Sequence, residues 1–236
     1  MKNTVITILL LATALSSVSQ VRLRGNVKRI SNQVDSFNIN IPKVYGFYKE
    51  NNRRILLTEK NQFDETIDLG EETFGKLEWG NRTYTLLLQP GITLEFSIDS
   101  LSGNITFGAN PTGRINTVIS QIELDKIPFF SLYGGSDSNE FSKLTVAQIK
   151  DKVIKPWLKH RDEKMGLVKN SHLDVRIKNL LVSELTYFHH NELNWYVRGI
   201  VRLNRSDLSN FLVDYYDSIS PVPYINFRFA VLLFCR

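Results

Sequence analysis

The chain has very little cysteine: Cys235 is the only thiol among its 236 residues. One thiol cannot build an internal disulfide, a cysteine-rich zinc module, an iron–sulfur cluster or a C-x-x-C redox pair. The chain also lacks the low hydrophobicity and high charge of a disordered protein, because 42% of its residues are hydrophobic and 22% are charged. The composition therefore predicts a folded protein, and no cofactor is expected.

No apolar run is long enough to cross a bilayer, which takes about 20 residues. The run at the N-terminus, residues 5–15, follows Lys2 and gives way to small residues that include Ser17 and Ser19. A basic start, a short apolar stretch and small residues at these two positions are typical of a secretory signal. The first 19 residues (1–19) therefore predict a signal peptide cut between Ser19 and Gln20. We expect a periplasmic or secreted protein with no transmembrane segment after cleavage, and the short run disfavours the alternative of a membrane anchor.

Charge is distributed unevenly along the chain. Residues 20–142 hold 13 Lys and Arg against 15 Asp and Glu (13 − 15 = −2), whereas residues 143–205 hold 13 against 6 (13 − 6 = +7). The spacing of apolar residues also changes along the chain, from strand-like to helix-like. We therefore predict an α+β protein in which residues 20–110 form an antiparallel β-sandwich or open barrel and residues 111–236 form a helical subdomain.

Strand signals are strong in the first part. Leu94, Phe96 and Ile98 alternate with polar residues, a period of two that puts them on one face of a sheet. Gly80-Asn81 suits a tight hairpin, and Pro90-Gly91 suits a turn between two further strands. About seven or eight short strands are expected, which is typical of a sandwich or open barrel. The other candidate strands are Val21–Ile30, Phe37–Ile41, Arg54–Thr58, Phe63–Leu69, Thr83–Leu88 and Asn104–Phe107.

Helix signals dominate the second part. Apolar residues recur at i, i+3, i+4 and i+7 in four stretches, which predicts four helices with one buried face each. Pro156 must kink the second of these helices or mark the start of a new one. The four stretches are 115–122, 146–157, 177–188 and 208–219.

Much of the chain resembles a known family, and the residues between Leu86 and Asn116 carry most of the resemblance. The run Leu86–Asp99 contains a Pro-Gly turn and a strand that ends in Asp, and Ile105–Gly108 then leads to Asn116. This order and spacing resembles the N-terminal domain of exported TlpA-like thiol–disulfide oxidoreductases, and Phe63–Ile67 looks like an earlier strand of that family. The resemblance covers roughly Val21 to Tyr224 and implies a sheet followed by a helical segment that opens at an Asn.

The resemblance also implies a following thioredoxin-fold domain with a W-C-x-x-C site, in which one thiolate attacks a disulfide and a second thiol resolves the mixed species. This chain has no second thiol that could act with Cys235. We therefore expect no enzyme activity and assign no catalytic residue. The expected function is that of a non-catalytic accessory domain of the cell envelope, either free-standing or truncated, whose partner is a thioredoxin-fold domain or another envelope protein.

Only one group of histidines and carboxylates stands out, and it consists of His189, His190 and Glu192. His189 and Glu192 have the i, i+3 spacing of metal ligands on a helix, but two ligands do not make a site. His160 and His172 lie in no ligand-spaced motif. We therefore expect an exposed polar turn at a helix end and no metal site.

The alternative function is a periplasmic binding module for a glycan, a peptide or an anionic envelope polymer. Sheet aromatics such as Trp79, Tyr84 and Phe96 would stack on the ligand, or basic helices that carry Trp157 would attract it. Acidic residues interrupt the basic ones, which favours a solvated helix face instead. No nucleic acid is expected, because an exported protein meets no genome. The basic residues are Lys143, Lys150, Lys152, Lys155, Lys159, Arg161, Lys164 and Lys169.

Overall fold

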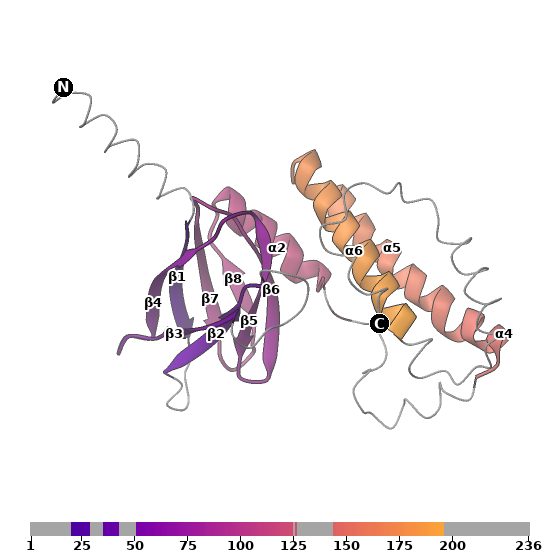
Figure 1. Ribbon diagram of the computed structural model, residues 1–236, viewed down its shortest axis with the longest axis horizontal. Coiled ribbons are helices and arrows are strands. Elements are labelled where there is room, and N and C mark those ends of the chain that lie inside the picture. Colours follow the sequence, from indigo (N-terminus) through magenta and orange to yellow (C-terminus); the bar gives the residue numbers. More distant parts are fainter. Residues whose placement is uncertain (1–19, 29–34, 43–50, 125, 127–143, 196–236) are drawn as a thin grey trace. The chain divides into compact units, whose positions relative to one another are not determined.

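The computed structural model describes residues 20–28, 35–42, 51–124, 126 and 144–195 (Figure 1). The chain divides into two compact units, with the division between Glu123 and Leu124. Within the described ranges, the first unit holds eight strands followed by one helix, and the second is helical. The protein therefore has an α+β fold with strands first and helices second, as predicted.

The first unit contains two four-stranded sheets, with the strand orders β4-β1-β7-β8 and β3-β2-β5-β6. Neighbouring strands are antiparallel except β1 and β7, which run parallel. The sheets are therefore mostly antiparallel, as predicted, with one parallel pair of strands. The strands are β1 (Gln20–Lys28), β2 (Ser36–Asn40), β3 (Asn52–Leu56), β4 (Gln62–Asp68), β5 (Thr73–Trp79), β6 (Arg82–Leu88), β7 (Thr93–Asp99) and β8 (Ile105–Phe107).

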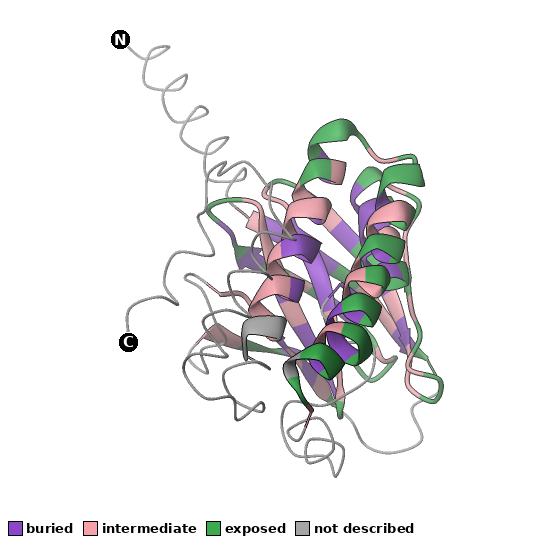
Figure 2. Cartoon of the chain, turned by 90° about the vertical axis from the view of Figure 1, so that its right-hand side faces the viewer, coloured by how far each residue is buried: buried purple, intermediate pink, exposed green. Residues whose placement is uncertain are grey.

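A single hydrophobic core lies between the two sheets and takes side chains from both. Leu94, Phe96 and Ile98 all point into it, so the predicted alternation along β7 is confirmed. Phe37 of one sheet meets Phe63 of the other edge to face, with ring centroids 5.0 Å apart. Figure 2 shows how buried and more exposed residues alternate along the strands. Because burying apolar surface is the main driving force for folding, this shared core holds the sheets face to face.

Both predicted tight turns are present. Trp79 pairs with Arg82 across the two-residue loop Gly80-Asn81, where Gly80 has a φ of 59°. Gly91 has a φ of 77°, a backbone conformation that glycine adopts without a side-chain clash. The strands on either side of Gly91, β6 and β7, belong to different sheets. This turn therefore carries the chain from one layer of the sandwich to the other.

The open edges of the two sheets are connected locally. On one side, the β3–β4 connection joins the sheets, and in it the Thr58 amide donates to the Gln62 carbonyl oxygen at 2.8 Å. On the other side, the Tyr84 hydroxyl of β6 donates to the Gly103 carbonyl oxygen at 2.7 Å. No ladder of backbone hydrogen bonds joins the two sheets within the described strands. The fold is therefore an open sandwich and not a closed barrel.

Helix α2 (Pro111–Ile122) contacts β6, β7 and β8. Its buried apolar residues are Ile115, Ile119 and Ile122, which follow the predicted helical stripe. The sequence predicts the end of the β domain at residue 110, whereas the compact unit in the structure extends through Glu123. The difference arises because α2 makes its contacts with the strands.

The second unit contains α4 (Val146–Ile149), a π-helical turn η2 (Lys150–Ile154), α5 (Lys155–Asn170) and α6 (Val175–Trp195). Pro156 stands in the first turn of α5, where its missing N–H needs no partner. It marks a new helix start, which is one of the two predicted outcomes. Three predicted features lie outside the described residues: the signal peptide at 1–19, the helix at 208–219 and Cys235.

We predict opposite effects for the same substitution in two helices. Gly113→Ala places a Cβ against the Gly108 carbonyl oxygen, far inside contact distance, and we expect it to destabilise the β unit by about 1–3 kcal/mol. Gly166→Ala in α5 meets no atom within 4 Å, and the better helix propensity of Ala should stabilise the helical unit by about 0.5–1 kcal/mol. Peptide-resolved hydrogen exchange of the full chain measures both changes. Stabilisation by Gly113→Ala would contradict the close approach of α2.

Candidate functional site

Side-chain hydrogen bonds surround the segment that leads from β8 into α2. Asn110 caps the helix, since its Oδ1 accepts from the Gly113 amide at 2.7 Å. Its Nδ2 donates to the Thr93 carbonyl oxygen, at the start of β7, at 3.0 Å. Thr112 Oγ1 adds a bond to Gln89 Oε1 at 2.9 Å. The N-terminus of α2 is thereby fixed to the sheet that contains β7.

Asn116 fixes the same helix to the other sheet. Its Oδ1 accepts from the Leu87 amide at 2.8 Å, and its Nδ2 donates to the carbonyl oxygens of Leu87 and Thr112, both at 3.0 Å. The side chain is fully buried, at 0% exposure. Leu87 lies on β6, an edge strand of its sheet, so the Asn116 amide takes the place of a neighbouring strand. We call Asn110 and Asn116 the α2 clamp.

The α2 clamp lies in the segment that carries the family resemblance. Asn116 is the residue at which that resemblance places the start of the helical segment, but the structure places it in the second turn of α2. The side-chain amides of Asn110 and Asn116 form their hydrogen bonds with backbone atoms of the protein. The nearby backbone amide of Gly108 donates to the Glu95 carbonyl oxygen at 2.8 Å. These residues therefore have a structural role, because their hydrogen bonds hold α2 between the two sheets.

The prediction of an exposed turn at His189, His190 and Glu192 is wrong. All three residues lie within α6, and His189 is only 1% exposed. His189 Nδ1 lies 2.8 Å from the Leu185 carbonyl oxygen, which can only accept, so Nδ1 carries the proton. Burial lowers the pKa of both His189 and His190 to about 4 and raises the pKa of Glu192. At neutral pH both histidines are therefore uncharged.

The burial of His189 could have been predicted from the sequence. Ile177, Leu181 and Leu185 form the predicted apolar stripe at intervals of four residues, and the next interval ends at His189. Residue type alone favoured the surface, whereas the helical period indicated the core. Among the residues that the structure describes, no group of three or more His, Cys, Asp and Glu could hold a metal ion.

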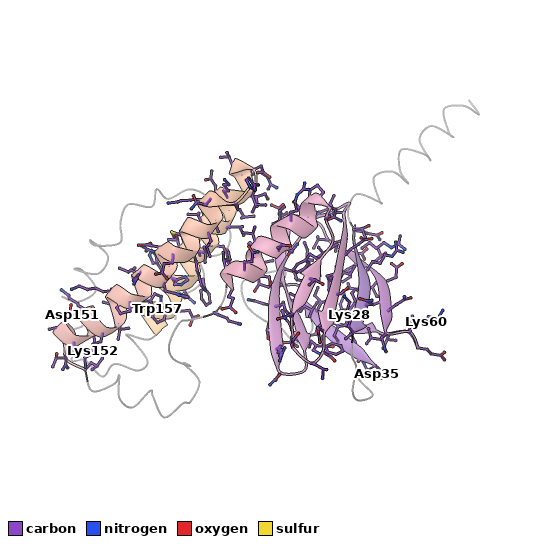
Figure 3. All side chains as sticks on the ribbon, turned by 180° about the vertical axis from the view of Figure 1, so that it is seen from behind. Lys28, Asp35, Lys60, Asp151, Lys152 and Trp157 are labelled. Atoms are coloured by element: carbon purple, nitrogen blue, oxygen red, sulfur yellow. The ribbon has the colours of Figure 1, made fainter. Side chains whose placement is uncertain are left out.

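Much of the basic segment is a solvated helix face, as the charge pattern favoured. Lys155 pairs with Asp151 at 2.6 Å, and Lys159 lies 3.9 Å from Glu163. Both pairs span one helical turn and are largely exposed, so each stabilises the helix only slightly. Lys152 is also exposed, near the start of this segment (Figure 3).

Two residues of the basic segment are not on its surface. Lys164 is only 5% exposed, and its Nζ donates to the Lys126 carbonyl oxygen at 2.9 Å. Trp157, labelled in Figure 3, is fully buried. The prediction that Trp157 could stack on a ligand is therefore wrong, because the ring is part of the core of the helical unit.

The aromatic residues of the sheets are likewise unsuited to ligand stacking. Trp79 and Phe96 are buried in the core between the sheets. Tyr84 is partly buried, and its hydroxyl donates to Gly103 as described above. The expectation that these three rings form a binding surface is wrong for Trp79 and Phe96, because the alternation along their strands turns them inward.

Comparison of the chain with family models, with curated proteins and with solved structures finds no match. None of the helices in the described ranges has both the length and the apolar character that a membrane span requires. The α2 clamp and the buried histidines of α6 are therefore assigned from geometry alone.

We predict that Asn116→Ala weakens the β6 edge. The substitution leaves the N–H and C=O of Leu87 without these partners, and we expect a loss of about 2–4 kcal/mol in the free energy of unfolding of the β unit. Asn116→Asp keeps an acceptor but removes both donors and buries a carboxylate, so it should be at least as damaging. Peptide-resolved hydrogen exchange across β6 measures the loss.

Gln121→Ala is the matched control, because Gln121 is an exposed residue of the same helix. We expect it to change stability by no more than about 0.5 kcal/mol. Wild-type protection of β6 in the Asn116→Ala protein would show that the Leu87 bonds do not hold the helix.

Proposed function

We propose that the chain is a non-catalytic accessory module of the cell envelope that positions a thioredoxin-fold partner, as the N-terminal region of TlpA-like thiol–disulfide oxidoreductases does. The proposal rests on the resemblance of the segment from Leu86 to Asn116. One observation supports it most: the α2 clamp within this segment ties a helix to both sheets. Residues used in this way build a rigid support, and a rigid support is what a positioning module needs.

The charged outer face of the β4-β1-β7-β8 sheet agrees with a supporting role. Arg22 binds Asp64 through two hydrogen bonds of 2.6 Å, and this pairing lowers the pKa of Asp64. Arg24 lies 3.9 Å from Glu95 on the neighbouring strand. A ligand of either charge would have to compete with these pairs. Both pairs are exposed, so each contributes little to stability, and the face presents paired charges of both signs to the solvent.

Export is part of the proposal and rests on the sequence of residues 1–19. In the proposed arrangement the thiol chemistry belongs to the partner, because this chain supplies no second cysteine for exchange. The contribution of the chain is the orientation of that partner in the envelope.

We predict no thiol–disulfide exchange activity for the protein that begins at Gln20. Insulin reduction with dithiothreitol should proceed at the rate of the blank, whereas a thioredoxin added as the positive control should accelerate it. Because resolution of a mixed disulfide needs a second thiol, Cys235→Ser should give the same result as the wild type. Catalytic turnover in either protein would refute a non-catalytic role.

We also predict that polyanions do not stabilise the protein. Asp151 and Glu163 each pair with a lysine of α5, and both pairs belong to a solvated helix face. We therefore expect heparin at low salt to leave the melting temperature unchanged. A shift at micromolar heparin that disappears at physiological salt would favour the alternative, a module that binds an anionic envelope polymer. Lys152→Glu reverses one exposed charge of this segment, so it should reduce such a shift if the basic residues bind the polyanion directly.

A further inference from the structure

The interface between α5 and α6 contains ionisable side chains at positions where an amphipathic helix pair has apolar ones. Lys164 and His189 are buried there among the apolar residues of the two helices. Polar residues at core positions weaken packing, so they commonly mark a functional or strained place in a fold. The buried residues are Trp157, Lys164 and Val168 on α5, and Ile177, Leu181, Leu185, Thr186 and His189 on α6.

His189 lies against aromatic rings of α5. Its ring centroid is 6.3 Å from that of Trp157, with the rings perpendicular, and 6.0 Å from that of His160. Because Nδ1 donates to Leu185, Nε2 carries only a lone pair, and it is buried without a hydrogen-bond partner among the residues that the structure describes. A proton added to Nε2 would therefore create a buried cation whose new N–H has no acceptor, an unfavourable state.

The ionisable groups that face His189 from α5 are basic. Burial is the main cause of its lowered pKa, and Lys164, His160 and Arg161 lower it further. Arg161 also lowers the pKa of His190, after burial, and itself binds Asp162 at 2.9 Å. Protonation of His189 would thus add a positive charge to a buried place that already holds positive charge.

We propose that the α5–α6 interface is an acid-sensitive latch, in which protonation of His189 opens the helical unit while the β unit stays folded. All four histidines, at positions 160, 172, 189 and 190, lie in the second unit. The β unit has no histidine to titrate in the same range. Opening exposes Trp157 and the apolar stripe of α6, so a hydrophobic surface becomes available to a partner only in acid.

The direction of the pH dependence follows from linkage. The pKa of His189 is about 4 in the folded unit and ordinarily 6.5, so the unfolded helix binds the proton first. The stability contributed by the neutral ring is complete above pH 6.5 and is lost as the pH falls toward 4. His190 acts in the same direction. Glu192 acts in the opposite direction, because burial raises its pKa and its protonation in acid favours the folded unit.

Hydrogen exchange of the full chain, resolved by peptide, tests the latch at about pH 7 and about pH 5 after correction for the intrinsic exchange rate. Peptides of α5 and α6 should lose protection by roughly tenfold or more, since one histidine with this pKa accounts for about twentyfold between the two pH values and Glu192 offsets part of it. Peptides of β5, β6 and β7 should keep their protection. Unchanged protection of α5 and α6, or equal loss in the strands, would overturn the proposal.

Two substitutions assign the effect to His189. His189→Leu continues the apolar stripe and removes one of the two buried histidines, so at pH 5 the α5–α6 interface should lose clearly less protection than in the wild type, and the remaining loss is due to His190. His189→Gln serves the same purpose if the leucine variant does not fold. His172→Gln removes an exposed histidine of the same unit and should behave like the wild type. A full acid response in the two His189 variants would refute the role of this residue.

Discussion

The pairing of the Asn116 amide with the peptide group of Leu87 determines how the β unit is closed. An edge strand exposes N–H and C=O groups that must find a partner in water, in another chain or in a covering element. Here the covering element is α2, whose Asn116 satisfies both groups of Leu87 while Asn110 binds the first residue of β7. The helix therefore joins the two sheets on the side that the β3–β4 connection leaves open, and its isoleucines can be buried there without leaving these backbone groups unpaired.

The parts of the fold that depend on local chemistry could be predicted from the sequence. The alternation of Leu94, Phe96 and Ile98 and the positive φ angles of Gly80 and Gly91 follow from patterns a few residues long. The parallel pairing of β1 with β7 could not be predicted in this way, because the two strands lie about 70 positions apart and no local pattern encodes which strands become neighbours. The end of the β unit at Glu123 was missed for a similar reason, since a helical period says nothing about what a helix covers.

The candidate sites were harder to predict, because a residue type does not show its surroundings. Trp79, Phe96 and Trp157 have the side chains of a ligand-binding surface but serve as core. His189 has the side chain of a surface residue, yet it continues the buried stripe of α6. In both cases the helical or strand period predicted burial better than the chemical character of the side chain did. The position of Asn116 was noted through the resemblance, but its bonds to Leu87 depend on tertiary contacts.

The most direct test of this account is the exchange rate of a single amide in the unmodified protein. If Asn116 satisfies the free edge of β6, the Leu87 amide should exchange only through opening of the whole β unit. In residue-resolved NMR it should then exchange as slowly as the amides that pair β6 with β5. An amide of Leu87 that exchanges many times faster than those paired amides, as expected for an open edge, would contradict the account.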